Sequence, residues 1–302
     1  MEYQNPKVYI LVLNYRNAFD TLACMESIQM LQYTNFEAVI LDNNSEDKSE
    51  ERIRSWIAEQ EDTRFHFLQT GENKGYAGGN NVGIQYALRR GDMDFVWVIN
   101  NDTIIDPGAL TELIKYISEN PKIGICGSKM IYSWDHSRIQ GYLGKMNPML
   151  GTSSFITGLP LHSDTSNLFV IGAGMLISKD VINQIGTFCE DYFLFYEEPD
   201  LCLRAQKAGF QIGCAVKSII YHKEGASTQG SSQKISQKSK LSDFYMVRSR
   251  ILFTKKFYPK FLPTVYLGLL VTIFNRIRRR QIDRIGMICS LMLDPYQKYK
   301  GA

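Results

Sequence analysis

The sequence has 302 residues, of which 44% are hydrophobic, so it can bury a full core as one large domain with an appendage or as two domains. Its net charge is only +3, which gives no reason to expect a nucleic acid as partner. Six cysteines without any C-x-x-C pair argue against a zinc site and a disulfide framework, and they fit a reducing cytoplasm.

Predicted strands and helices alternate through the first part of the chain. Short apolar runs predict buried strands at 8–13, 38–41, 65–68 and 95–99. Helices are expected at 19–31, at 46–60, from the end of a glycine-rich turn (71–83) to about residue 90, and at 107–119. This alternation predicts an α/β fold with a Rossmann-like, mostly parallel sheet flanked by helices.

The rest of the chain is less regular. Loops and hairpins that cover a site are expected at 128–167, followed by a strand at 168–178 that Gly172-Ala173-Gly174 interrupts. Glycines inside a strand pattern often mark the close approach of a ligand or of another backbone. A helix is expected after the acidic segment near 197, and then a short strand at 219–221 that leads to His222.

Polar side chains follow the first, second and fourth predicted strands, where a ligand is expected in an open α/β sheet. Asp102, beside Asn100 and Asn101, is suited to hold a divalent cation, although Asn and Asp are also common turn residues. Asp42 can accept a hydrogen bond from the imide N–H of uracil or thymine. The alternative there is a helix start capped by Ser45, and both can hold at once.

The segment from Asn73 to Asn81 is rich in glycine but lacks the spacing of the G-x-G-x-x-G dinucleotide motif. Its small residues let the backbone approach a ligand at a helix N-terminus, where N–H groups favour anions or sugar oxygens. A loop that needs positive φ angles would explain one or two of these glycines.

Glu197, Glu198 and Asp200 supply three carboxylates in four residues, and crowding of like charges can raise a pKa as a general base requires. The alternative is a helix start, where acidic residues are favoured. His222 is a candidate ligand for a metal or a diphosphate, whereas a lone histidine is more often structural.

Together these segments resemble the family 2 inverting glycosyltransferases of the GT-A fold, in particular their rhamnosyltransferase-like branch. The resemblance spans about residues 7–225. The matching segments are Val12 to Tyr15, Leu41 to Ser45, Asn73 to Gly83, Asn100 to Thr103, Gly172 to Met175, Tyr196 to Arg204, and His222-Lys223.

The resemblance implies a role for each matching residue. Asn14 and Tyr15 would border the nucleotide base and Asp42 would bind it. The other expected donor-binding residues are Asn44, Asn73, Lys74, Gly75, Gly79, Asn80, Asn101 and Arg204. The expected metal ligands, for Mg²⁺ or Mn²⁺, are Asp102 and His222. Glu198 would be the catalytic base and Asp200 an acid near the acceptor, while Gly172, Gly174 and Met175 would lie on the acceptor side.

Two departures from the family pattern bear on these roles. The metal motif reads Asn-Asn-Asp, so an amide replaces its first carboxylate. The base position holds Glu rather than Asp, which leaves the choice between Glu197 and Glu198 open.

The implied reaction is a single displacement at the anomeric carbon of a nucleotide sugar. The expected donor is dTDP-rhamnose, with UDP-hexoses next. The acceptor would be a hydroxyl of a saccharide, expected to be lipid-linked, in bacterial surface polysaccharide synthesis. The rival functions are a sugar nucleotidyltransferase and a non-catalytic glycan-binding scaffold of the same fold.

Three segments are expected along the chain: a catalytic domain at 1–225, a flexible linker or lid at 226–242, and a helical, basic extension at 243–302. In the extension, an apolar stretch at 261–274 precedes an arginine cluster, which favours a helix lying on an anionic membrane. Packing on the catalytic domain and a homodimer contact are the alternatives. No signal peptide is evident, and the apolar run at 265–274 is too short to span a bilayer, so we expect a cytoplasmic protein, peripheral at the inner face of the membrane.

Overall fold

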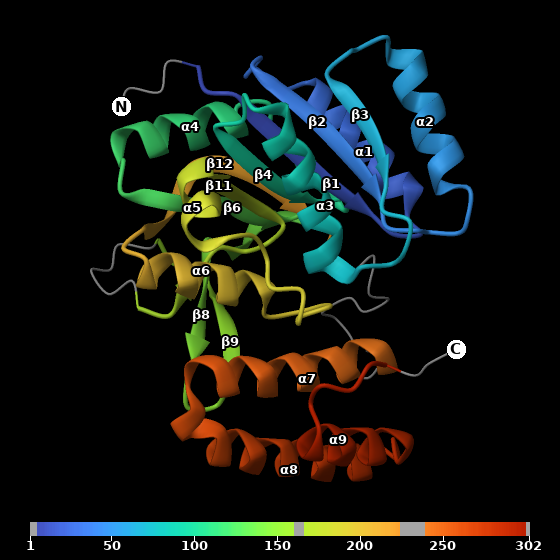
Figure 1. Ribbon diagram of the computed structural model, residues 1–302, viewed down its shortest axis with the longest axis vertical. Coiled ribbons are helices and arrows are strands. Elements are labelled where there is room, and N and C mark those ends of the chain that lie inside the picture. Colours follow the sequence, from blue (N-terminus) through green and yellow to red (C-terminus); the bar gives the residue numbers. More distant parts are fainter. Residues whose placement is uncertain (1–4, 160–165, 224–238, 300–302) are drawn as a thin grey trace.

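The computed structural model describes residues 5–159, 166–223 and 239–299 (Figure 1). A mixed sheet with helices on both faces forms the larger part. A smaller sheet lies below it, and three C-terminal helices lie at the far end of the molecule. The α/β architecture with a mostly parallel sheet is therefore as the sequence predicted.

The main sheet runs in the order β3-β2-β1-β4-β11-β6-β12-β5, and β7 pairs with β6. Its first four strands, all parallel, are β3 (Phe65–Gln69), β2 (Phe36–Asp42), β1 (Val8–Asn14) and β4 (Phe95–Asn100). The others are β11 (Gly174–Ser178), β6 (Ile123–Tyr132), β12 (Gln211–His222), β5 (Thr103–Ile105) and β7 (Asp135–Gly141). Strand β11 runs antiparallel between β4 and β6, which the strand–helix alternation does not predict.

Apolar side chains are buried on both faces of this sheet. In β1, Val8, Ile10 and Val12 enter one core cluster, while Tyr9 and Leu11 enter the other. The first cluster lies under α1 (Ala18–Gln29), α2 (Ser49–Gln60) and α4 (Ala109–Glu119). The second lies under α3 (Gly75–Arg90), α5 (Lys179–Ile185) and α6 (Glu197–Lys207). Burial on both sides explains why the central strands read as continuous apolar runs.

The glycine-rich segment is mostly helix, so the turn expected at 71–83 is wrong beyond residue 74. Only Gly75, the first residue of α3, has a positive φ among the glycines of this helix (+68°). A Cβ on Gly79 would lie 2.6 Å from Leu13, and one on Gly83 would lie 2.9 Å from Leu11. These two glycines therefore allow the helix to pack closely on β1.

The segment expected as loops at 128–167 forms regular structure in its described part. Strand β6 runs on to Tyr132, and β8 (Leu143–Asn147), β9 (Thr152–Ile156) and β10 (Leu168–Phe169) form a second sheet in the order β10-β8-β9. The single strand expected at 168–178 is wrong, because β10 and β11 belong to different sheets. The strand expected at 219–221 is the end of the longer β12.

The C-terminal extension is helical, as predicted. It consists of α7 (Lys240–Phe257), a 3₁₀ turn η2 (Pro259–Phe261), α8 (Leu262–Arg278) and α9 (Asp283–Leu293). Of the expected linker, residues 226–238 lie outside the described ranges, and residues 240–242 already belong to α7. Within the described ranges one helical segment, Pro259–Arg278, is long and apolar enough to cross a bilayer by length and composition, so the apolar stretch is longer than the run at 265–274 suggested.

Candidate active site

A buried chain of hydrogen bonds links the polar ends of three neighbouring strands. The Asn14 amide donates to Asp42 Oδ1 (2.6 Å) at the end of β2. The Thr21 hydroxyl of α1 donates to Asn14 Oδ1 (2.8 Å), and the Asn101 amide donates to the Thr21 hydroxyl (3.0 Å). The ends of β2, β1 and β4 are thereby held in a fixed relation, with Asp102 next along the chain.

Asp42 uses its acceptor positions within the protein. Its Oδ1 accepts from Asn14 and from the Ser45 hydroxyl (2.5 Å), and its Oδ2 accepts from the Ser45 N–H and the Gln69 amide, both at 3.0 Å. Gln69 is the exposed donor, so a nucleobase would reach this carboxylate by displacing Gln69. The helix cap considered for Ser45 is wrong, because α2 begins at Ser49 with Lys48 at its N-cap.

The loops after β2 and β3 are tied together beside Asp42. The Asn43 amide donates to Asn73 Oδ1 and to the Gly75 carbonyl (both 3.1 Å), and its Oδ1 accepts from the Lys74 N–H (3.0 Å). Asn44 follows in the left-handed region (φ 57°). These loops present backbone next to the predicted base-binding residue.

Three other expected donor-binding residues lie at the rim of this region or under it. The ring of Tyr15 lies 5.2 Å from the guanidinium of Arg16. Gly79 packs against β1, and its role is therefore helix packing. Asn80 is buried, and its side-chain oxygen has no hydrogen-bond partner.

Asp102 and His222 form a buried pair. Pairing of β12 with β5 sets His222 opposite Thr103, and His222 Nε2 lies 3.2 Å from Asp102 Oδ1 without the alignment of a hydrogen bond. Gln140 Oε1 lies 3.0 Å from His222 Nδ1, so a proton on Nδ1 leaves the lone pair of Nε2 beside the carboxylate. No sequence motif points to Gln140, because it acts through a residue far away in the chain.

This pair fits a divalent cation, because a buried imidazole nitrogen with no hydrogen-bond partner adjoins a carboxylate oxygen. Among the residues that the structure describes, no three His, Cys, Asp or Glu side chains gather as a metal cluster. The protein would thus supply two ligands, and oxygens of a bound ligand and water would supply the others.

Glu198 faces Gly172 from the first turn of α6. A Cβ on Gly172 would lie 2.3 Å from Glu198 Oε1 and 2.8 Å from the Tyr76 hydroxyl, which donates to the Gly172 carbonyl (2.9 Å). Burial raises the pKa of Glu198 to about 7, against the opposing effect of backbone hydrogen bonds that include one from Gly172. The sequence predicted that a ligand or another backbone lies close to this glycine. In the structure a side-chain carboxylate lies there.

Glu197 is 2% exposed, and its Oε2 is buried without a hydrogen-bond partner. Burial first, and then the charge of Glu198, raise the pKa of Glu197 well above its usual value. Burial is the main cause at both glutamates, whereas the sequence pattern had suggested crowding of charge. Burial therefore disfavours the charged form of Glu197.

Asp200 and Arg204 lie on the other side of α6, since two residues along a helix turn the side chain by about 200°. Asp200 Oδ1 accepts from Arg204 Nε and Oδ2 from Lys256 Nζ of α7, both at 2.5 Å. Arg204 also donates to the carbonyls of Ile185 and Thr187 (both 2.8 Å). The structure does not bring these two residues to the side of Glu198.

On the expected acceptor side only Gly172 adjoins Glu198. Met175 is fully buried within β11, between β4 and β6. A Cβ on Gly174 would lie 2.4 Å from Ile220, so this glycine serves packing within the sheet. The Gly-Ala-Gly pattern therefore combines one residue at the site with structural ones.

Tyr76 connects the glutamates of α6 with the strand ends. Its pKa is raised well above the usual value by burial and then by the charges of Glu198, Glu197 and Asp102. The side chains of α6 and Asp102, far apart in sequence, therefore act on one buried hydroxyl. Tyr76 belongs to the glycine-rich segment Asn73 to Asn81, but the sequence predicts no role for it. Its contact, Gly172, is distant in sequence.

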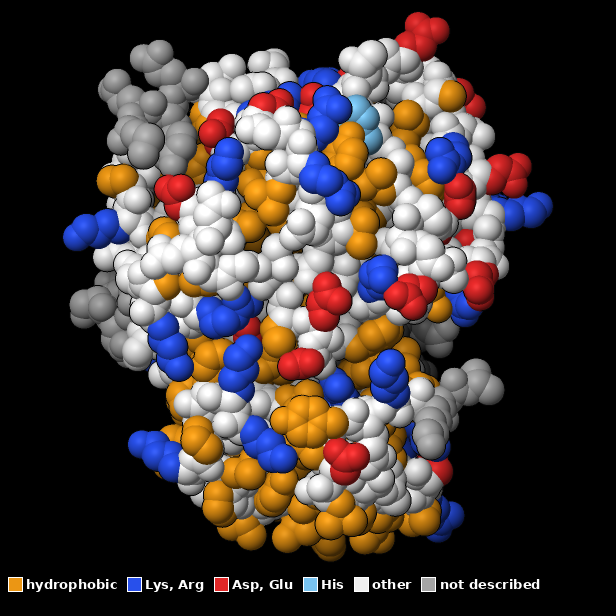
Figure 2. Space-filling view, in the orientation of Figure 1, with side chains coloured by type: hydrophobic (Ala, Val, Ile, Leu, Met, Phe, Trp, Pro, Cys, Tyr) orange, Lys and Arg blue, Asp and Glu red, His pale blue; other side chains and the backbone are white. Residues whose placement is uncertain are grey.

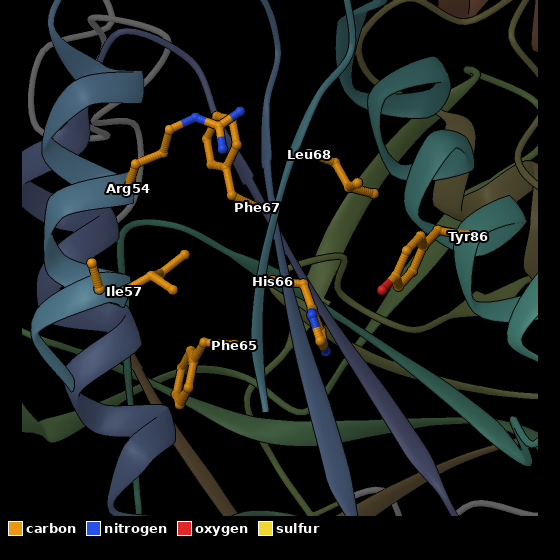
Figure 3. Close-up of a pocket in the computed structure, with 8 residues that line it drawn as sticks. Arg54, Ile57, Phe65, His66, Phe67, Leu68 and Tyr86 are labelled. Atoms are coloured by element: carbon orange, nitrogen blue, oxygen red, sulfur yellow. The ribbon is translucent and has the colours of Figure 1, made fainter. Parts of the chain in front are cut away.

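A surface hollow of about 370 Å³ lies elsewhere, along the edge strand β3 (Figure 3). Phe65, His66 and Phe67 of β3 lie there between Arg54 of α2 and Tyr86 of α3. None of the residues of the strand-end site lines this hollow, so it is separate from the candidate active site.

Comparisons with known proteins agree with this geometry. Residues 9–186 match the family model described as Glycosyl transferase family 2. The chain is 28% identical over 218 residues to the low-salt glycan biosynthesis hexosyltransferase Agl10 of Haloferax volcanii, a match that covers 70% of this chain and 66% of that protein. It is 23% identical over 260 residues to the dTDP-rhamnosyl transferase RfbF of Shigella flexneri, covering 83% of this chain and 81% of that one.

Among solved structures, the fold is similar to that of the mannosyltransferase PcManGT from Pyrobaculum calidifontis, in complex with GDP-Man and Mn²⁺. The TM-score is 0.59 at 12% identity, and the match covers 98% of this chain and 83% of that chain. At this identity the similarity shows the GT-A fold alone.

Proposed function

The chain belongs to glycosyl transferase family 2, and from this premise we propose that it is an inverting glycosyltransferase that uses a nucleotide-sugar donor. The observation that carries the proposal is the partly buried Glu198 side chain with its pKa near 7, which shares the surroundings of one tyrosine hydroxyl with Asp102. A general base is most effective when its pKa lies near the working pH. The proposed reaction therefore depends on Glu198 and Asp102 together.

In the proposed reaction Glu198 accepts the proton of the acceptor hydroxyl while that oxygen attacks the anomeric carbon. The new bond to the acceptor oxygen forms as the bond to the nucleoside diphosphate breaks, so the configuration inverts. Gly172 leaves Glu198 room at this position, and Tyr76 fixes the Gly172 backbone. Burial disfavours the charged form of Glu197, which lowers the repulsion between it and the base.

A divalent cation, Mg²⁺ or Mn²⁺, held by Asp102 and His222 would neutralise charge on the departing diphosphate. The nucleotide is proposed to lie along the strand ends, with its base at Asp42 and Asn14 and its phosphates near Asn101. The Mn²⁺ named with PcManGT supports a cation in this fold, and Agl10 and RfbF support a sugar donor.

The proposed donor is dTDP-rhamnose, with UDP-hexoses next, and the proposed acceptor is a saccharide hydroxyl in polysaccharide synthesis. RfbF, named a dTDP-rhamnosyl transferase, supports the first choice. We place the reaction in the cytoplasm, because all six cysteines are free, as a reducing compartment favours.

The test is release of nucleoside diphosphate from a panel of dTDP- and UDP-sugars, with Mn²⁺ and with excess chelator. A glycosyltransferase releases the diphosphate from one donor class, even with water as a poor acceptor, and loses the release with chelator. A sugar nucleotidyltransferase would release pyrophosphate from a nucleoside triphosphate and a sugar phosphate. A glycan-binding scaffold would release neither product, and either result would contradict the proposal.

A further inference from the structure

The outer surface of α8 is apolar and exposed. Its side chains recur at helical spacing on one stripe, and α9 continues the stripe at its end. We call this surface the outer face, and its main residues are Leu267, Leu270, Val271, Phe274, Ile277 and Leu293, which are 51–90% exposed. Figure 2 shows hydrophobic side chains gathered over this end of the molecule. A contiguous apolar patch of this kind marks an interaction surface.

The inner side of the same helices is firmly packed, which excludes a loosely held segment. Val265 and Leu269 of α8 are buried, and Leu269 packs in one cluster with residues of α7 and α9. Arg276 donates to Asp243 of α7 (2.9 Å), and the Tyr266 hydroxyl donates to the Met292 carbonyl (3.1 Å). Were α8 to cross a bilayer, these bonds along its length would be lost, so the helix fits a position along a surface rather than across it.

Basic side chains border both ends of the outer face. Lys260 precedes α8, Arg278 is its last residue, and Arg279 and Arg280 follow it, all exposed. The sequence of α8 contains no acidic residue. A second copy of the chain would place basic ends against basic ends in either orientation, which disfavours a dimer through this face. Anionic lipid complements both the apolar stripe and its basic ends.

We propose that the outer face of α8 and α9 docks on an anionic lipid surface, with α8 lying in the plane of the headgroups. The apolar stripe enters the boundary of the acyl chains, and the arginines at its end contact lipid phosphates. This docking is independent of the proposed reaction, so it holds or fails whether or not the strand-end site transfers a sugar.

Cys289 provides a probe within this surface. It is exposed on α9 one turn before Leu293, and Cys189 is the other cysteine that is not buried. In full-length protein carrying Cys189→Ser, a polarity-sensitive dye on Cys289 reports the environment of the outer face. We expect its emission to shift to the blue with vesicles that contain phosphatidylglycerol, and not with vesicles of phosphatidylcholine alone.

Two variants, the first with a matched control, test the apolar contact and the basic contact. Phe274→Glu should abolish the shift, whereas Met30→Glu, at a 68% exposed site at the end of α1, should leave it unchanged. Replacing Arg278, Arg279 and Arg280 by Gln should weaken vesicle binding at least about tenfold. Thermal melting followed by circular dichroism confirms that each variant is folded.

Several results would overturn the proposal. One is the absence of a shift with every vesicle; another is a shift that Phe274→Glu leaves intact. A dimer in sedimentation that Phe274→Glu dissociates, without vesicle binding, would assign the outer face to a second copy. Bound protein that resists extraction by alkaline carbonate would show a spanning helix instead of a docked one.

Discussion

At the scale of single residues, the proposed chemistry depends on the different burial of two adjacent glutamates. Glu198 keeps a partly exposed side chain and has its pKa raised to about 7, whereas Glu197 is closed off, with one oxygen unpartnered. The sequence left the choice between them open, because both stand at the start of the same helix. Their different neighbours, Gly172 above all, are why we propose Glu198 as the base.

Replacing each glutamate by glutamine tests this assignment. Glu198→Gln should lower kcat by roughly 10²–10⁴-fold, the usual contribution of a general base, and leave donor binding nearly intact. Glu197→Gln should change kcat only a few-fold, because an amide resembles the neutral acid. Steady-state transfer and calorimetric titration of the donor measure both. A reversed order of the two effects would make Glu197 the base.

The pKa of Glu198 also sets how activity and stability depend on pH. Because the base works ionised, kcat should fall as pH drops below about 7. The raised pKa means that folding is favoured by the protonated form, so this contribution is present below about pH 4.5 and is lost as pH rises through about 7.

Glu198→Gln should therefore be more stable than the parent by about 1–3 kcal/mol at pH 8, with the difference vanishing towards pH 4.5. Thermal unfolding at both pH values measures it. Equal stability of the two proteins at pH 8 would mean that the carboxylate is well solvated.

At the scale of elements, α6 is anchored to the C-terminal extension on the side away from Glu198. Asp200 is completely buried between Arg204 and Lys256, whose side chains are 20% and 40% exposed. We therefore assign Asp200 a positioning role, joining α6 to α7, in place of direct contact with the acceptor.

Asp200→Asn should lower the free energy of unfolding by about 1–3 kcal/mol, because it leaves two cations beside a buried amide, while their partial exposure moderates the cost. Lys256→Met should cost less, and the double variant should show coupling between the two positions. Denaturant unfolding measures these changes. A hundredfold loss of kcat in Asp200→Asn at unchanged stability would instead support the role that the family resemblance implied.

The same scale shows which elements the sequence can predict. The strands β1, β2 and β4 are evident, because burial on both faces demands continuous apolar runs. Only the second half of helix α3 is evident, because the glycines of its first half, which serve close packing on Leu13 and Leu11, look like those of a loop. The antiparallel placement of β11 depends on partners distant in sequence, and local pattern does not specify them.

Some residues of the candidate site can likewise be predicted from the sequence, and others cannot. Asn14, Asp42 and Asp102 are predictable, because polar side chains directly follow buried strands at one edge of the sheet. Thr21, Gln69 and Gln140 are not, because each acts through a contact with a residue far away in the chain. Where α2 begins shows that Ser45 is not its cap, and hydrogen bonds that only the folded chain shows hold Arg204 against two carbonyls.

At the scale of the whole molecule, α7 separates the site from the outer face (Figure 1). Helix α6 contacts α7 through Asp200 and Lys256, and α7 contacts α8 through Asp243 and Arg276. Because packed helix axes typically lie 8–10 Å apart and a lysine side chain bridges α6 and α7, α6 lies at least about 16–20 Å from α8. A docked enzyme would thus act at a distance from the lipid headgroups.

This spacing predicts a preference among lipid-linked acceptors. On vesicles, acceptors that carry several sugars should be used at least about tenfold better than a lipid that carries one, because only a longer saccharide spans two helix layers. Transfer of labelled sugar to a series of acceptors of increasing length measures it. Equal use of all lengths would contradict the proposed orientation on the membrane.

The proposed mechanism depends most on one cation lying between Asp102 and His222 and close to the nucleotide. The direct measurement is an anomalous-scattering map at the manganese edge from crystals grown with dTDP and Mn²⁺. We predict a single strong peak bonded to Asp102, to His222 Nε2 and to oxygens of the diphosphate, with the thymine near Asp42. A manganese peak elsewhere, or dTDP bound away from these residues, would contradict the account.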